Sequence, residues 1–189
     1  MAKRLILVFV FVAGFLSFFS SCRKPFPADN RKSASPESTG YIVKRGDSAP
    51  LFIAYTTDSM QMQLAALKGG VIMLQFTASW CSVCRAEMPV IESEIWQKYK
   101  SNPNFSLFAV DLKEPVEKIR PFIADTKITY PVLLDPDGKI FKLFALEDAG
   151  VTRNVIIDKE GKIAMLTRLY DKDEFGKMIQ CIDSLLRIR

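Results

Sequence analysis

Residues 71–84 read VIMLQFTASWCSVC and say more about the architecture than any other part of the chain. The first six residues form a nearly continuous apolar run, which is typical of a strand buried on both faces. A short loop follows, and two cysteines with C-x-x-C spacing, Cys81 and Cys84, stand where a helix begins that we expect to reach about Lys100. The pattern therefore predicts a strand, a loop and a helix, with the cysteine pair in the first helical turn.

A cysteine at the start of a helix has unusual chemistry. Free N–H groups and the positive end of the helix dipole stabilise a thiolate there, which lowers the pKa of Cys81 from about 8.5 towards neutrality. Cys84 lies one turn further on, faces inward and can close a disulfide with Cys81. The pair can therefore cycle between dithiol and disulfide through a mixed disulfide.

Three alternatives to redox chemistry exist for the cysteine pair: a structural disulfide, half of a zinc site and two ordinary buried cysteines. A disulfide that closes so small a loop removes little entropy from the unfolded chain. A four-cysteine zinc site would need all four cysteines, and Cys22 lies in a targeting segment. We therefore favour a redox function and expect neither a metal nor a cofactor.

Strands and helices alternate from Gly40 to the C-terminus. Further strands are expected over 105–112, 132–134, 151–157 and 162–169, and helices over 116–125, 140–145 and from about 173. The stretch 41–58 indicates a leading hairpin or an edge strand. This order predicts an α/β domain with a mixed central sheet.

The N-terminal segment is expected to be a targeting signal rather than part of the domain. Lys3 and Arg4 precede an apolar run, and small residues precede Cys22, as in a secretory signal that resembles a bacterial lipobox. The predicted organisation is a lipoprotein signal over 1–22, a flexible linker over 23–39 and one domain over 40–189. Cys22 would carry the lipid. An uncleaved membrane anchor is the alternative, and either one places the domain outside the cytoplasm.

Composition excludes several function classes. The 189 residues include no histidine, which excludes Ser-His and Cys-His catalysis and imidazole metal sites. The formal charge of +5 belongs mostly to the first 39 residues, since the rest has 20 basic and 19 acidic side chains. No basic stripe with interleaved aromatics appears, so nucleic acid is not an expected partner.

The stretch FTASWCSVCRAEMP, residues 76–89, resembles the active-site signature of the TlpA/ResA-like membrane-tethered thiol–disulfide oxidoreductases. Further matches are GDSAP at 46–50, YPVLLD at 130–135 and VIIDKEGKI at 155–163. The resemblance implies a thioredoxin-like fold, with a mixed central sheet flanked by helices and an extra N-terminal hairpin.

The resemblance also implies roles for residues around the pair. Cys81 would attack, Cys84 would resolve the mixed disulfide and Trp80 would cover the pair. Glu87, one turn after Cys84, would tune the titration of the thiols and relay a proton; the alternative is a solvated surface acid. Pro89 is expected to kink the helix rather than end it.

One position departs from the family pattern. The family has a cis-proline beside the cysteine pair, and counting back from Ile157-Asp158 puts Thr152 in that place. A cis peptide before another residue costs about 3–4 kcal/mol, which favours a trans peptide here. Trp80, Thr152 and Arg153 are candidate substrate-binding residues. Because peroxiredoxins have an arginine near this loop, Arg153 also suggests a peroxidase function. A charged residue on the surface is its simpler interpretation.

The resemblance implies a reductase of protein disulfides on the outer side of a membrane. Its partners would be client proteins such as apocytochrome c and a membrane protein that supplies electrons. Two alternatives stay open: a peroxiredoxin-like thiol peroxidase, for which the P-x-x-x-T-x-x-C motif is missing, and a non-catalytic binding lipoprotein on the same scaffold. Cys181 is interpreted as a core or boundary residue of the last helix.

Overall fold

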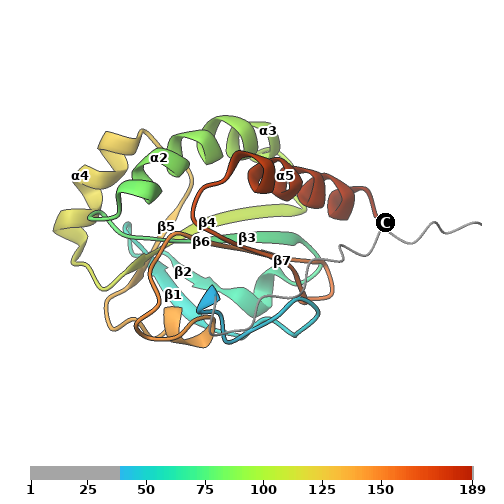
Figure 1. Ribbon diagram of the computed structural model, residues 1–189, viewed down its shortest axis with the longest axis horizontal. Helices are drawn as coiled ribbons and strands as arrows, with labels where there is room; N and C mark the ends of the chain where they lie inside the picture. Colours follow the sequence, from blue (N-terminus) through green and yellow to red (C-terminus); the bar gives the residue numbers. More distant parts are fainter. Residues whose placement is uncertain (1–38, 189) are drawn as a thin grey trace, which may run out of the picture. The chain divides into compact units, whose positions relative to one another are not determined.

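The computed structural model describes residues 39–188, which contain one mixed sheet of seven strands (Figure 1). The strands stand in the order β2-β1-β5-β4-β3-β6-β7. Their bounds are β1 Ile53–Thr56, β2 Gln61–Gln63, β3 Val71–Thr77, β4 Phe105–Leu112, β5 Val132–Asp135, β6 Arg153–Ile157 and β7 Ile163–Arg168. The predicted apolar run is thus an interior strand of the sheet, β3, between β4 and β6.

The direction of the strands follows from the connections between them. Strands β3, β4 and β5 are parallel, and each crossover between them contains a helix. Strands β6 and β7 form an antiparallel hairpin on one side, and β1 and β2 form another at the opposite edge. Every residue of β3 is buried, as expected for a strand covered on both faces.

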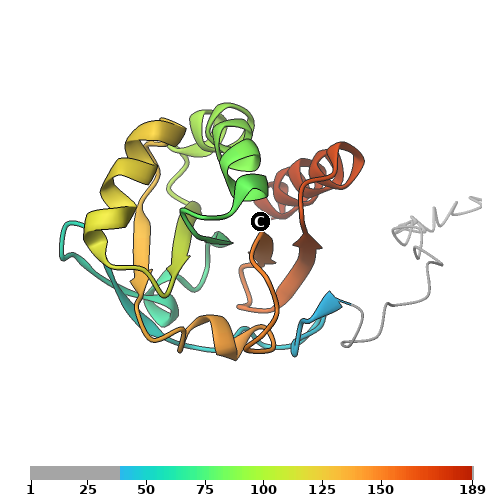
Figure 2. The same cartoon turned by 60° about the vertical axis from the view of Figure 1, so that its left-hand side comes forward.

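The long helices cover one face of the sheet. Figures 1 and 2 show α2, α4 and α5 on this face, and the short η3 together with the chain before β1 on the other. Their bounds are α2 Ser82–Ile91, α4 Val116–Thr126, α5 Lys172–Arg187, η1 Leu64–Leu67 and η3 Phe141–Leu143. Phe76 packs on the η3 side, with its ring 5.5 Å from that of Phe141 and 5.3 Å from that of Phe144.

The helix after the cysteine pair continues past Pro89. The π-helical turn η2 (Glu92–Trp96) and α3 (Gln97–Tyr99) follow α2 directly, and the Glu92 N–H donates to the carbonyls of Met88 and Pro89. Pro89 therefore does not end the helix, as predicted. Within residues 39–188 no helix is both long and apolar enough to cross a membrane.

Most expected elements are confirmed, with shifted bounds. The N-terminal hairpin exists, but it occupies 53–63 instead of 41–58, because the chain before it runs along the sheet with only isolated bridges at Tyr41 and Ser48. Strand β6 begins at Arg153, so Thr152 lies in the loop before it. The signal 1–22 with Cys22, and the linker up to residue 38, lie outside the described residues.

Candidate functional site

The cysteine pair lies at the start of α2, joined as a disulfide with 5.3 Å between the Cα atoms. Cys81 is the N-cap residue of the helix, and its Sγ accepts a hydrogen bond from the Cys84 N–H at 3.1 Å. Cys81 is 7% exposed and Cys84 is fully buried. Both cysteines are therefore buried, Cys81 less completely than Cys84, and the Cys81 sulfur is held against a helix N–H, which is the arrangement that stabilises a thiolate.

Thr152 contacts both sulfurs. Its Oγ1 lies 3.2 Å from Cys81 Sγ and 3.0 Å from Cys84 Sγ, and the residue is fully buried. The Val151–Thr152 peptide is cis, so the expectation of a trans peptide was wrong. That expectation weighed only the local cost and left out tertiary contacts, which here include a hydrogen bond from the Leu169 N–H to the Thr152 carbonyl.

Glu87 is buried on the side of α2 that packs against the sheet, and it is not a solvated surface acid. Its two carboxylate oxygens accept hydrogen bonds from Gln75 Nε2 at 3.1 Å and from Asn154 Nδ2 at 2.8 Å. Burial raises the pKa of Glu87 to about 7, against the lowering effect of these two bonds. A carboxyl group that titrates near neutral pH can both accept and return a proton.

The partners of Glu87 belong to a longer chain of buried polar groups that the sequence analysis missed. The Tyr130 hydroxyl donates to Gln75 Oε1 at 2.8 Å, and Asn154 Nδ2 also contacts Thr167 Oγ1 at 3.0 Å. The signal was present for Gln75, which interrupts the apolar run 71–76, whereas Asn154 follows another polar residue, Arg153, at the start of its strand. A polar residue in such a strand needs a hydrogen-bond partner, and Glu87 is that partner here.

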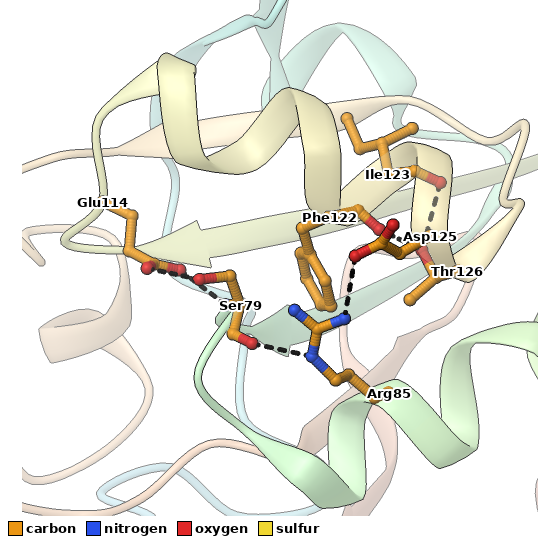
Figure 3. A network of polar contacts seen from close by, with 7 residues as sticks. All are labelled: Ser79, Arg85, Glu114, Phe122, Ile123, Asp125 and Thr126. Atoms are coloured by element: carbon orange, nitrogen blue, oxygen red, sulfur yellow. Dashed lines mark hydrogen bonds and ion pairs between the residues drawn. The ribbon is translucent and has the colours of Figure 1, made fainter.

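A second network holds the loop in front of the cysteine pair (Figure 3). Glu114 accepts from the Ser79 N–H at 2.5 Å and from the Ser79 hydroxyl at 2.7 Å. Arg85 donates from Nε to the Ser79 carbonyl at 2.9 Å, lies over the Phe122 ring and pairs with Asp125 at 3.3 Å. Arg85 and Glu114 therefore anchor Ser79 from both sides.

Trp80 and Arg153 lie differently from each other. Trp80 is 64% exposed beside Cys81, so its ring is available to a partner. Arg153 is 1% exposed, so its interpretation as a surface charge was wrong. Its guanidinium lies 4.6 Å from the centre of the Tyr41 ring and its Nε donates to the Gly150 carbonyl, contacts that local sequence does not reveal.

The register of the sheet separates Arg153 from the face that carries Glu87. Arg153 is opposite Phe76 in β3, whereas Asn154 is opposite Gln75, and neighbouring residues of a strand point to opposite faces. Arg153 therefore shares the η3 side with Phe76, while Asn154 and Gln75 point to α2. On that side, the Arg153 side chain donates to the Gly150 carbonyl and lies over the Tyr41 ring.

Asp111 is another buried acid that the sequence analysis did not single out. It is opposite Thr77 in register, which places it on the helix-covered face near the end of β4. Within residues 39–188 neither of its oxygens has a hydrogen-bond partner. Burial, followed by the charge of Glu114, raises the pKa of Asp111 to about 7.

Cys181 on α5 is half-buried and packs against the core, as the sequence predicted for a boundary residue. Burial raises the pKa of this thiol.

Comparison with known proteins shows the family to which a chain with this geometry belongs. The sequence profile of the AhpC/TSA family matches residues 45–166. The chain belongs to the AhpC/TSA family. The thiol-disulfide oxidoreductase ResA of Oceanobacillus iheyensis is 33% identical over 109 residues, which are 56% of this chain and 56% of that protein. The match thus spans little more than half the length of this curated relative.

Two solved structures of similar proteins agree with this family assignment. A Bacteroides thetaiotaomicron protein proposed to be a protein disulfide isomerase is 53% identical, with a TM-score of 0.77 over 79% of this chain and 94% of that one. A Chlorobium tepidum protein proposed to be the thiol:disulfide interchange protein DsbE is 27% identical, with a TM-score of 0.67 over 76% and 99%. The predicted thioredoxin-like fold is confirmed.

Proposed function

We propose that this chain is an extracytoplasmic thiol–disulfide oxidoreductase, anchored through Cys22, that reduces disulfides of client proteins. The observation that carries the proposal is the Cys81–Cys84 disulfide at the N-terminus of α2, in which Cys81 is less deeply buried than Cys84. A purely structural disulfide would not need that asymmetry, and it would stabilise little at this loop length. The names of the similar proteins support the same activity.

The reaction begins with Cys81. Its thiolate attacks one sulfur of a client disulfide, that S–S bond breaks, and the released client thiolate takes a proton from water. Cys81 is then joined to the client in a mixed disulfide. Trp80, which is 64% exposed beside Cys81, is the candidate contact for the client chain, whereas Thr152 is fully buried.

Resolution uses the buried half of the site. Cys84 must lose its proton before it can attack Cys81 Sγ, and Glu87, one turn further on the same helix, is the proposed acceptor. The new Cys81–Cys84 bond releases the second client thiolate. Two electrons have then passed to the client, and a dithiol of a membrane donor protein restores the reduced pair.

The test is a redox titration of the full chain in glutathione and dithiothreitol buffers, read by thiol trapping and mass spectrometry. A reversible couple near about −270 mV supports a reductase, whereas one near about −120 mV indicates an oxidant of clients. A non-catalytic scaffold gives no reversible couple. In cells, Cys84→Ser should accumulate mixed disulfides with clients at Cys81, and the matched control Cys181→Ser should not.

A thiol peroxidase is the less favoured function. The side chain of Arg153 contacts Tyr41 and Gly150 on the η3 side of the sheet. A peroxidase would form a sulfenic acid at Cys81 rapidly at micromolar peroxide, and Arg153→Ala would slow that step. We expect neither the rapid reaction nor the dependence on Arg153.

The anchor is tested separately. Metabolic labelling with a radioactive fatty acid should mark the wild-type chain and leave Cys22→Ser unlabelled. Labelling that persists in Cys22→Ser would contradict lipid attachment at this residue and would leave the oxidoreductase proposal intact.

A further inference from the structure

We propose that the Thr152 hydroxyl bridges the two sulfurs of the reduced pair, donating to the Cys81 thiolate and accepting from the Cys84 thiol. This role deepens the proposed oxidoreductase function and rests on it. The proline that the resembling family has at this position carries no hydroxyl, so the bridge would belong to this chain's own sequence.

The geometry meets the requirements of such a bridge. Thr152 Oγ1 lies 3.2 Å from Cys81 Sγ and 3.0 Å from Cys84 Sγ, and all three groups are buried. A hydroxyl has one proton to donate and two lone pairs to accept with, so it can serve both sulfurs at once. The hydrogen bond from the Leu169 N–H fixes the backbone of Thr152 at this place.

The direction of the bridge follows from the difference between the sulfurs. Cys81 Sγ already accepts a hydrogen bond from the Cys84 N–H at 3.1 Å and belongs to the less deeply buried residue, so the negative charge is stabilised there. Two donors, the Cys84 N–H and the Thr152 O–H, then converge on Cys81. The remaining lone pairs of the hydroxyl face the fully buried Cys84, which keeps its proton until resolution.

Except for Asp111, the charged groups named on the surrounding elements are hydrogen-bonded elsewhere. Their hydrogen bonds run from Glu87 on α2 to Gln75 and Asn154, from Arg85 on α2 and Glu114 after β4 to Ser79, and from Arg153 on β6 to Gly150. Asp111 on β4 adds a buried carboxyl on the helix-covered face. The side-chain hydrogen bond at the two sulfurs therefore comes from a neutral group, Thr152.

The experiment compares Thr152→Val, which removes the hydroxyl and keeps the shape, with Thr152→Ser, which keeps the hydroxyl. The full chain is reduced, and the rate of Cys81 alkylation by iodoacetamide is followed against pH by mass spectrometry. Since a hydrogen bond to a charged group is at stake, Thr152→Val should raise the midpoint for Cys81 by about one pH unit. Thr152→Ser should leave it within about 0.3 unit of wild type.

The redox potential gives a second readout. Loss of the donor destabilises the reduced thiolate form about tenfold relative to the disulfide, so the Thr152→Val couple should become more negative by about 30 mV. The potential should be measured at a pH above the alkylation midpoints of both proteins, where the reduced species is the thiolate.

Each outcome decides the proposal. An unchanged midpoint in Thr152→Val overturns the bridge, and so does an equal shift in Thr152→Val and Thr152→Ser, which would point to packing. If Thr152→Val does not fold, Thr152→Ala takes its place, with the oxidised protein's circular dichroism as the check. Alkylation needs no client, so the bridge can fail while the redox couple, and with it the oxidoreductase function, stands.

Discussion

Two buried carboxyl groups on the helix-covered side of the sheet, Glu87 and Asp111, titrate at a similar pH in different surroundings. Burial is the main cause that raises the pKa of each to about 7. Glu87 accepts hydrogen bonds from Gln75 and Asn154, whereas within the described chain both oxygens of Asp111 are without a partner. The same pKa therefore arises in one site with hydrogen-bond donors and in one without them.

The difference shows why a shifted pKa alone does not identify a catalytic acid or base. The donors from Gln75 and Asn154 fix the orientation of the Glu87 carboxyl group and stabilise its charge when it ionises. Glu87 also stands on the helix that carries the cysteine pair, one turn from Cys84. Asp111 has neither property, so we expect its ionisation to affect folding and not thiol exchange.

The largest effect is expected for the resolution step. Glu87→Gln removes the proposed proton acceptor, so release of a model client from the Cys81 mixed disulfide at about pH 7 should slow by about 100- to 1,000-fold. Stopped-flow measurement of released thiol gives the rate. The matched control is Asp111→Asn, which removes the other buried acid and should change the rate by less than about twofold.

A comparable loss of rate in Asp111→Asn would show that the two acids act together. An unchanged rate in Glu87→Gln would instead remove Glu87 from the mechanism. The pH dependence separates a structural effect from a proton transfer, since the wild-type rate should rise through about pH 7 as Glu87 ionises and the rate of Glu87→Gln should lack this step.

The next effect concerns stability. Because its folded-state pKa of about 7 exceeds the unfolded value, Asp111 lowers the free energy of unfolding as pH rises from about 4 to 7. Asp111→Asn should therefore raise the free energy of unfolding by about 2–3 kcal/mol at about pH 8, and the gain should vanish near about pH 3. Urea denaturation at both pH values measures it.

Glu87→Gln sharpens this comparison. The pKa of Glu87 is also raised in the folded state, so removing its carboxyl group should likewise increase the free energy of unfolding at about pH 8. The substitution also disturbs the hydrogen bonds from Gln75 and Asn154, so the gain should be smaller, about 1 kcal/mol. Equal gains in the two variants would mean that the hydrogen bonds to Glu87 contribute nothing to stability.

A smaller effect is expected when one donor is removed. Gln75→Met keeps the length of the side chain and deletes the N–H that donates to Glu87, so the pKa of Glu87 should rise from about 7 by about one unit. A carbon-13 NMR titration of the glutamate carboxyl carbons measures the shift. Tyr130→Phe, which removes only the donor to Gln75 Oε1, is the control and should shift the pKa less.

These partners mark the limit of prediction from sequence. Cys81, Cys84 and their place at a helix start follow from neighbouring residues, and Thr152 was located by counting back from Ile157-Asp158. The hydrogen bond between Asn154 and Glu87 joins residues 67 positions apart, and the contact between Thr152 and Cys81 spans 71. Such pairs depend on strand register, which a single sequence specifies only through its apolar pattern.

The buried arginine illustrates the same limit. Arg153 follows a loop and is the first residue of an apolar strand, which is the local pattern of an exposed charge, yet it is buried and contacts the Tyr41 ring and the Gly150 carbonyl. Tyr41 belongs to the stretch whose structure the sequence left open. The fold class and the position of the cysteine pair at a helix start could therefore be predicted, whereas the groups that contact the pair and Glu87 required the packing of the sheet.

The smallest effect extends the comparison to an exposed acid. Asp125 is mostly exposed and pairs with Arg85 at 3.3 Å, so Asp125→Asn should lower the free energy of unfolding by less than about 0.5 kcal/mol. Arg85 keeps its hydrogen bond to the Ser79 carbonyl and its contact with the Phe122 ring, so the redox potential should not change. Urea denaturation and the glutathione titration measure both. A loss above about 1 kcal/mol would mean that this surface pair, and not Glu114 alone, holds the loop in front of Cys81.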